Sequence, residues 1–293
     1  MSRRCRPPHD KPVQVRRAVN PLQHLTYNPT LVNSARRLHV AGILSWCEYR
    51  LRGRRVCLPM HEGDLVIPVP DARQFRSLQG FYREEWGELR FLKAVEQRLR
   101  HGGICYDVGS SIGQFLIPVA KLVGERGLVV GFEPNRTNYE QLLKAVAAYG
   151  LANARVFRLA LGDHEGEAQI FGSDSGATIV PPAGNGEGRS HVEAVRVARG
   201  DDLRAAEGLP LPKAVKIDVE GAEFSVLSGL TDTLSSPICE LLCLEIHPHL
   251  APPAVTTEMV LSLVRSFGFN RAEGRPRRDV IHLIAEKTRQ VSQ

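Results

Sequence analysis

The sequence predicts an α/β fold: a mostly parallel sheet covered by helices on both faces. After Gly102-Gly103, short apolar segments alternate with amphipathic ones along the rest of the 293-residue chain. Alternation of this kind favours parallel strands joined by crossover helices. A chain of this length can bury a core of its own, so the fold requires neither disulfides nor a structural metal.

Each element is predicted from its apolar spacing. Strands are expected over residues 104–109, 128–134, 154–162, 191–198, 214–221, 240–248 and 279–287, and helices over 114–124, 137–150, 222–230 and 259–267. Pro118 fits the first of these helices only in its first turn, where an N–H has no intrahelical partner. Thr137 and Glu140 form a capping box that opens the next helix, and Gly150 ends it. The Gly-, Pro- and Ser-rich segment 172–190 is expected to be a long surface loop.

The positive charge lies in the N-terminal part of the chain. Residues 1–55 hold 12 Lys/Arg and two acidic residues, whereas the remaining 238 residues hold 26 Lys/Arg and 30 Asp/Glu. The body is therefore mildly acidic, which argues against a nucleic-acid partner. We expect a basic, disordered tail over 1–30, a helical and strand extension over 31–100, and the main domain over 101–293.

The extension contains two apolar helical patterns with short strands between them. Residues 31–48 form a helix that either packs on the main domain or lies on a membrane surface. Residues 55–69 indicate short strands around a turn, and residues 81–100 carry one helical stripe of large apolar side chains.

No feature of the sequence indicates secretion or a membrane span. No run reaches the ~18 uninterrupted apolar residues that a spanning helix needs. The arginines at the start are not followed by an apolar segment, so a secretory signal is not expected. The six cysteines are scattered without a CxxC pair, which favours a reducing compartment and a cytoplasmic protein.

Polar residues gather where the predicted strands end, and open parallel sheets bind ligands at those ends. The first such turn runs from Asp107 to Gly113, and its small residues Gly109, Ser110 and Ser111 would let a ligand approach the backbone. The turn lacks the dinucleotide pattern GxGxxG. Glu133 ends the next strand, where an acidic side chain can accept hydrogen bonds from ribose hydroxyls.

Two later strands end in acidic residues and a histidine. By the two-residue period of a strand, Lys216, Asp218 and Glu220 share one side, and Glu245 and His247 share another. If these strands are neighbours, Asp218, Glu245 and His247 converge. Such a group could abstract a proton from a hydroxyl, bind a divalent metal, or form a purely structural network. Glu223 is explained as a first-turn helix residue favoured by the helix dipole.

At these residues the chain resembles the FkbM family of S-adenosylmethionine-dependent methyltransferases. The matching segments, in order, are YDVGSSIG (106–113), GFEPN (131–135), LALGDHEGEA (159–168), VKIDVEGAE (215–223) and LEIHP (244–248). The chain departs from the family at Ser110-Ser111, where Ala-Asn is usual.

The resemblance implies a Rossmann-like class I methyltransferase fold, whose seven-stranded sheet has an antiparallel last strand, and S-adenosyl-L-methionine as cofactor. By position, Asp107, Gly109, Ser110, Ser111 and Gly113 would surround the methionine part of the cofactor. The ribose would be held by Glu133, with Pro134 and Asn135 beside it, and the adenine would lie along Ala160 and Leu161. Asp218 would sit near the sulfonium.

The function implied is O-methylation of a hydroxyl on a sugar, polysaccharide or polyketide-type product. We expect His247 or Asp218 to take the hydroxyl proton, with Glu220 and Glu245 orienting it, so that His247→Ala loses turnover but keeps cofactor affinity. The alternatives are an NAD(P)-type oxidoreductase and a catalytically inactive scaffold that binds the cofactor. Nucleic-acid methylation is disfavoured, because the fourth strand lacks an Asp/Asn-Pro-Pro-aromatic turn and no Pro-Cys occurs.

Overall fold

The structure is a computed structural model that describes residues 41–51, 53–60, 63–68, 72, 75, 88–99, 102–171, 178–180 and 192–288. By internal contacts the chain divides into two units, Met1–Gly53 and Arg54–Gln293. The predicted tail (1–30) and the first part of the predicted helix over 31–48 lie outside the described residues.

One helix of the first unit is described, α3 (Ala41–Leu51). Glu48 and Tyr49 on it are buried, whereas Trp46 is half exposed with the Arg50 guanidinium 5.1 Å from its ring centroid. Within the part of the chain that is described, no helix is both long and apolar enough to cross a membrane.

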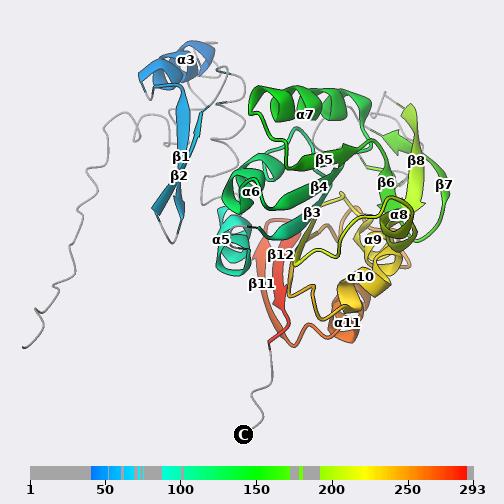
Figure 1. Cartoon of the computed structure of the whole chain (residues 1–293). Helices are drawn as coiled ribbons and strands as arrows, with labels where there is room; N and C mark the ends of the chain where they lie inside the picture. The colour runs from blue at the N-terminus through cyan, green and yellow to red at the C-terminus, as the bar shows by residue number, and fades with distance from the viewer. Residues whose placement is uncertain are drawn as a thin grey trace, which may run out of the picture. The chain divides into compact units, whose positions relative to one another are not determined.

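The second unit begins with a hairpin and continues with the predicted alternation (Figure 1). Its elements are β1 (Arg55–Met60), β2 (Gly63–Pro68), α5 (Glu88–Arg98), β3 (Ile104–Val108), α6 (Leu116–Val123), β4 (Leu128–Phe132), α7 (Arg136–Ala148), β5 (Ala154–Phe157), β6 (Ala160–Gly162), β7 (Gly166–Phe171), β8 (Val192–Arg199), α8 (Gly200–Ala206), β9 (Ala214–Ile217), α9 (Glu223–Gly229), α10 (Thr231–Ser235), β10 (Leu241–Ile246), α11 (Thr257–Ser266), β11 (Arg271–Arg277) and β12 (Val280–Glu286).

The central sheet has seven strands in the order β11-β12-β10-β9-β3-β4-β5. Its core strands are parallel, and β12 runs antiparallel to both of its neighbours, β10 and β11. This confirms the predicted mostly parallel sheet with an antiparallel last strand. A smaller sheet, β6-β8-β7, forms beside it.

The two faces of the central sheet differ in chemistry. Residues such as Val108, Ile217 and Leu244 point to one face and form an apolar core with α9 and α11. The alternate residues point to the face that α5 and α6 cover, and they include Asp107 and Lys216. Figure 1 shows α5 and α6 on one side of the sheet and α9 and α11 on the other. The polar residues of the strands therefore lie on the α5/α6 face.

Several predicted elements differ in their extent. The single strand expected over 154–162 is two strands in different sheets, because the chain leaves the central sheet after Phe157 and β6 pairs with β8. The strand expected over 214–221 ends at Ile217, because Glu220 and Gly221 adopt positive φ. The N-cap of α7 is Asn135 rather than Thr137, since the Asn135 side chain accepts from the Asn138 amide.

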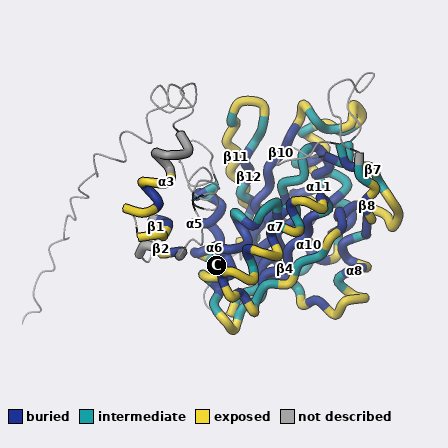
Figure 2. The backbone as a smooth tube through the Cα atoms, turned by 90° about the horizontal axis from the view of Figure 1, so that it is seen from above, coloured by how far each residue is buried: buried dark blue, intermediate teal, exposed yellow. Residues whose placement is uncertain are grey.

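The sequence did not indicate β7, α8, α10 or β11. Strand β11 has a polar composition with a glycine and a proline, and it is exposed over most of its length at the edge of the sheet (Figure 2). An edge strand of this kind carries no apolar alternation to be read. Pro118, as predicted, lies in the first turn of α6.

Candidate functional site

The turn between β3 and α6 brings the chain very close to the end of β9. Gly109 has φ +80°, and a Cβ placed on it would lie 1.8 Å from the Asp218 carbonyl oxygen. Only glycine fits such an approach. Ser111 also adopts a left-handed φ of 49°, and Ser110 Oγ donates to the Asp107 carbonyl at 2.7 Å. The predicted small-residue turn is therefore a tight, strained loop at the carboxyl edge of the sheet.

Glu133 ends β4 beside this turn and is 5% exposed. Its two carboxylate oxygens accept from the Ser111 amide at 2.7 Å and the Asn135 amide at 2.9 Å. Burial raises the pKa of Glu133 to about 7, although both hydrogen bonds favour the ionised form. Each oxygen keeps a further lone pair, so the carboxylate can still accept a hydrogen bond from a ligand.

A buried lysine separates two aspartates at the centre of the sheet. Lys216 Nζ lies 3.5 Å from Asp107 Oδ1 and 3.3 Å from Asp218 Oδ2, and it donates to the Gly109 carbonyl at 3.1 Å. Burial raises the pKa of Asp107, and the Lys216 charge partly opposes that rise. Burial also raises the pKa of Asp218, but the charges of Lys216 and His247 outweigh burial, so the pKa of Asp218 lies below its usual value. Asp218 is therefore ionised at neutral pH.

His247 is surrounded by four carboxylates. Its Nδ1 lies 2.8 Å from Glu223 Oε1, and its Nε2 lies 3.6 Å from Glu220, 3.8 Å from Glu245 and 3.9 Å from Asp218. Burial by itself lowers the pKa of the imidazole. The Glu223 hydrogen bond and the Asp218 charge outweigh it and raise the pKa to about 9. The imidazole is therefore a cation at neutral pH.

Glu220 sits on the turn after β9 with φ 51°, a conformation uncommon for a non-glycine residue. Its carbonyl accepts from Thr178 Oγ1 at 2.6 Å, which holds the turn. Burial and the neighbouring Asp218 charge raise the pKa of the Glu220 carboxyl to about 7, against the opposing effect of His247. Among the residues predicted to be catalytic, Glu220 has a pKa suited to exchanging a proton near neutral pH.

Among the described residues, the side chains that could bind a metal form two overlapping groups. Asp218, Glu220 and His247 make one, and Glu88, Asp218 and Glu245 make the other; within each group the ligand atoms lie within 4.8 Å of one another. Asp218 belongs to both. The set considered from the sequence, Asp218 with Glu245 and His247, is thus divided between them.

The predicted convergence of Asp218, Glu220, Glu245 and His247 is present in the structure, because β9 and β10 are neighbours. The sequence reading missed three members of the cluster. Glu223, read as a helix-dipole residue, is buried and bonds both His247 and the Gly221 amide. Glu88 Oε2 is buried near Asp218, and burial raises its pKa well above the usual range.

The third missed residue is His282 of β12, whose Nε2 lies 3.1 Å from Glu245 Oε1. The available signal was a pair of polar residues in an apolar strand, His282 and Glu286, which are four residues apart.

Ala160 and Leu161 lie in β6 with buried side chains, and Leu161 belongs to the apolar core. Asn135 caps α7, a structural role in addition to the one expected of it.

The sheet order, with its antiparallel β12 between β10 and β11, is that of the Rossmann-like class I methyltransferase fold. A family model described as the methyltransferase FkbM domain matches residues 107–270. The chain belongs to the FkbM family of S-adenosylmethionine-dependent methyltransferases.

Two other methyltransferases are similar to part of the chain. The hexuronic acid methyltransferase AglP of Haloferax volcanii is 29% identical over 177 residues, which cover 59% of this chain and 68% of the relative. The crystal structure of methyltransferase FkbM from Methylobacillus flagellatus KT is 16% identical with a TM-score of 0.44. That match covers 73% of this chain and 59% of the other, so this chain spans less than two thirds of it.

The residues at the carboxyl edge fit the family's cofactor, S-adenosyl-L-methionine. The cofactor carries a positive sulfonium and a positive ammonium, and the edge holds several carboxylates. Both Asp107 carboxylate oxygens are buried and accept no hydrogen bond from the described residues. The Gly109 turn packs directly against the Asp218 carbonyl at this edge, and Glu133 retains acceptor capacity. These residues would hold the cofactor, which supplies an electrophilic methyl group.

Proposed function

We propose that the chain transfers a methyl group to a hydroxyl of a sugar-containing acceptor, with Glu220 as the proton acceptor. The observation that carries this is the position of the Glu220 carboxylate at the carboxyl edge of the sheet, 3.6 Å from His247 Nε2. Glu220 has a pKa of about 7, and the neighbouring His247 has a pKa of about 9. An alcohol oxygen becomes a good nucleophile as its proton leaves, so a carboxylate that titrates near neutral pH is suited to the step.

The roles within the predicted set therefore change. His247 or Asp218 was expected to take the proton, but a protonated imidazole has no free lone pair to do so. Its charge instead helps to keep Asp218 ionised and lowers the pKa of Glu220. Asp218, held by Lys216, supplies a fixed negative charge beside the site. Glu223 holds the imidazole through Nδ1 and so positions it.

The proton and the electrons balance in a single displacement. The acceptor oxygen forms a bond to the methyl carbon, the hydroxyl proton passes to a Glu220 carboxylate oxygen, and the electron pair of the broken carbon–sulfur bond stays on sulfur. The base is regenerated when Glu220 loses the proton to water.

A sugar acceptor is supported by the similarity to a hexuronic acid methyltransferase. A polyketide hydroxyl presents the same chemistry, and an assay panel separates the two. The nicotinamide alternative does not hold, because the family is one of methyltransferases. An inactive scaffold would bind the cofactor but transfer nothing.

The test is labelled methyl transfer from S-adenosylmethionine onto neutral oligosaccharides, uronate oligosaccharides and a macrolide. Glu220→Gln should lower kcat by ~10²–10⁴-fold. Its affinity for S-adenosylmethionine, measured by calorimetry, should be unchanged. Glu165→Gln is the matched control, because Glu165 is exposed and pairs only with Arg196 among the described residues.

The pH profile tests the same proposal. In the wild-type protein, kcat/KM should rise through about pH 7 as Glu220 loses its proton and fall above about pH 9 as His247 loses its own. The lower limb should disappear in Glu220→Gln. A variant that turns over at the wild-type rate with the same lower limb would show that Glu220 is not the base.

A further inference from the structure

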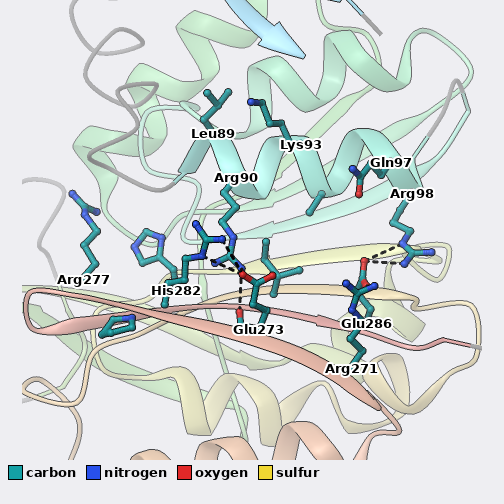
Figure 3. A pocket seen from close by; sticks show the side chains of 14 residues that line it. Leu89, Arg90, Lys93, Gln97, Arg98, Arg271, Glu273, Arg277, His282 and Glu286 are labelled. Carbon is teal, nitrogen blue, oxygen red and sulfur yellow. Dashed lines mark hydrogen bonds and ion pairs between the residues drawn. The ribbon is translucent and has the colours of Figure 1, made fainter. Parts of the chain in front are cut away.

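A groove of about 760 Å³ lies between α5 and the β11–β12 hairpin (Figure 3). Its lining contains six Lys or Arg residues: Arg90, Lys93, Arg98, Arg271, Arg275 and Arg277. Two acidic residues, Glu273 and Glu286, also line it. Such an excess of positive charge is unusual here, because residues 56–293 together hold more acidic than basic side chains.

The ion pairs inside the groove leave this excess in place. Glu273 is shared between Arg90 at 2.8 Å and Arg275 at 3.0 Å. Glu286 is shared in the same way between Arg98 at 2.8 Å and Arg271 at 3.6 Å. In each case one carboxylate faces two guanidinium groups and can neutralise only one positive charge. Both ends of the groove therefore keep a net positive charge.

Arg90 also has an unused donor. Its Nη2 bonds Glu273, but its Nη1 is buried and finds no acceptor among the described residues. A buried N–H without an acceptor is costly, and a guanidinium presents its donors in a fork that matches a carboxylate or a phosphate. Nδ1 of the neighbouring His282 is likewise buried without a partner in the described part of the chain. These groups are placed to receive an anionic oxygen.

One row of register partners runs from the groove to the proposed site. Glu245 of β10 is the register partner of His282 on β12, and His282 is the partner of Arg275 on β11. Register partners point to the same face, here the face that α5 covers, where the His282 ring stacks on Phe91. Neighbouring strands lie ~4.8 Å apart, so Arg275 is about 10 Å from Glu245 in the backbone.

The charge reverses along this row. Asp218 and Glu245 make the inner end acidic, whereas Arg275 and Arg277 make the outer end basic. Figure 3 shows His282 and Arg277 at one end of the groove and Arg98 with Glu286 at the other. The guanidinium groups of the groove therefore lie on the same face of the sheet as the carboxylates of the site, with the buried His282 between them.

We propose that this groove binds an anionic group of the acceptor, a carboxylate or a phosphate on a glycan, while a hydroxyl of the same molecule reaches Glu220. The proposal rests on the proposed function and specifies its substrate class. Helix α5 has 11 residues, so the groove is ~16 Å long, which suits a short oligosaccharide. The acidic charge of the surrounding body disfavours a nucleic acid.

The test measures binding to the full chain in the presence of S-adenosylhomocysteine, so that no reaction occurs. The probes are trigalacturonate for a carboxylate, UDP-glucose for a phosphate, maltotriose as the neutral comparison and a short single-stranded RNA. Arg275→Ala suits the test because its side chain is 68% exposed. Arg90→Ala removes the buried donor, and Arg90→Lys keeps the charge without the fork.

We expect one of the two anionic sugars to bind more tightly than maltotriose. Arg275→Ala and Arg90→Ala should each weaken that binding by about tenfold, with Arg90→Lys intermediate. Arg265→Ala is the control, since Arg265 pairs with Glu258 on α11 and lies outside the groove. Whichever anionic sugar responds identifies the group as carboxylate or phosphate.

Three results would overturn the proposal: neither anion binds more tightly than maltotriose, their binding is unchanged in both alanine variants, or the RNA binds in their place. These results leave the proposed reaction untouched, because methyl transfer to a neutral sugar could still depend on Glu220. Conversely, arginine-dependent binding of an anionic sugar without any methyl transfer would refute the reaction and support the groove.

Discussion

Replacing Glu223 by glutamine tests the electrostatic account of the site. The side chain is 1% exposed and accepts from His247 at 2.8 Å and from the Gly221 amide at 2.9 Å. A glutamine keeps the shape and an acceptor oxygen but removes the charge. The rise of the His247 pKa from 6.5 to about 9 corresponds to on the order of 3 kcal/mol of preference for the imidazolium.

Glu223 supplies the largest of the contributions that raise this pKa, so the variant should lower the His247 pKa toward its ordinary value. Because the folded-state pKa lies above the unfolded value, the pair stabilises the fold fully below pH 6.5. That stabilisation is lost as the pH rises through about 9. The difference in unfolding free energy between wild type and variant should therefore shrink between pH 6.5 and pH 9.5.

The measurements are an NMR titration of the labelled imidazole and urea unfolding at the two pH values. Asp163→Asn is the control, because the Asp163–His164 pair has a similar separation of 2.7 Å but both side chains are at least half exposed. Solvent screens such a pair, so little change is expected. An unchanged His247 titration in Glu223→Gln would refute the assignment of Glu223 as the residue that holds the imidazole charged.

Two further predictions concern the turn after β3. Gly109→Ala should destabilise the protein by roughly 3 kcal/mol or more, because its Cβ meets the Asp218 carbonyl. Gly150→Ala, with a positive φ but nothing within 4 Å, should cost only about 1 kcal/mol in the same urea experiment. Equal losses would show that the close approach is not the cause. Ser111→Asn should raise the unfolding free energy by about 0.5–1 kcal/mol, since asparagine tolerates φ 49° better than serine. A melting temperature that does not rise would contradict this.

The fold could be predicted because the sequence of each core strand has the pattern of a buried strand. Segments such as 104–109 and 240–248 are short and apolar, with polar residues at their ends, and that pattern belongs to strands buried on both faces. The same pattern placed Asp107, Glu133, Asp218 and His247 at strand ends, where the structure has them. Two features had no such pattern: the edge strand β11, and the point after Phe157 where the chain leaves the central sheet. Both depend on which strand each segment pairs with, and pairing partners are distant in the sequence.

The sheet, the glycine turn and the carboxylates at its edge could be predicted from the local pattern of residues, since periodicity fixes which side of a strand each residue faces. The contacts between these residues come from the tertiary structure. Glu223, ordinary in the sequence, raises the pKa of His247, and that shift is the basis for proposing Glu220 as the proton acceptor. The groove of arginines exists because α5, β11 and β12 come from distant parts of the chain. Burial and neighbouring charge set a pKa, and both depend on contacts that no local pattern encodes.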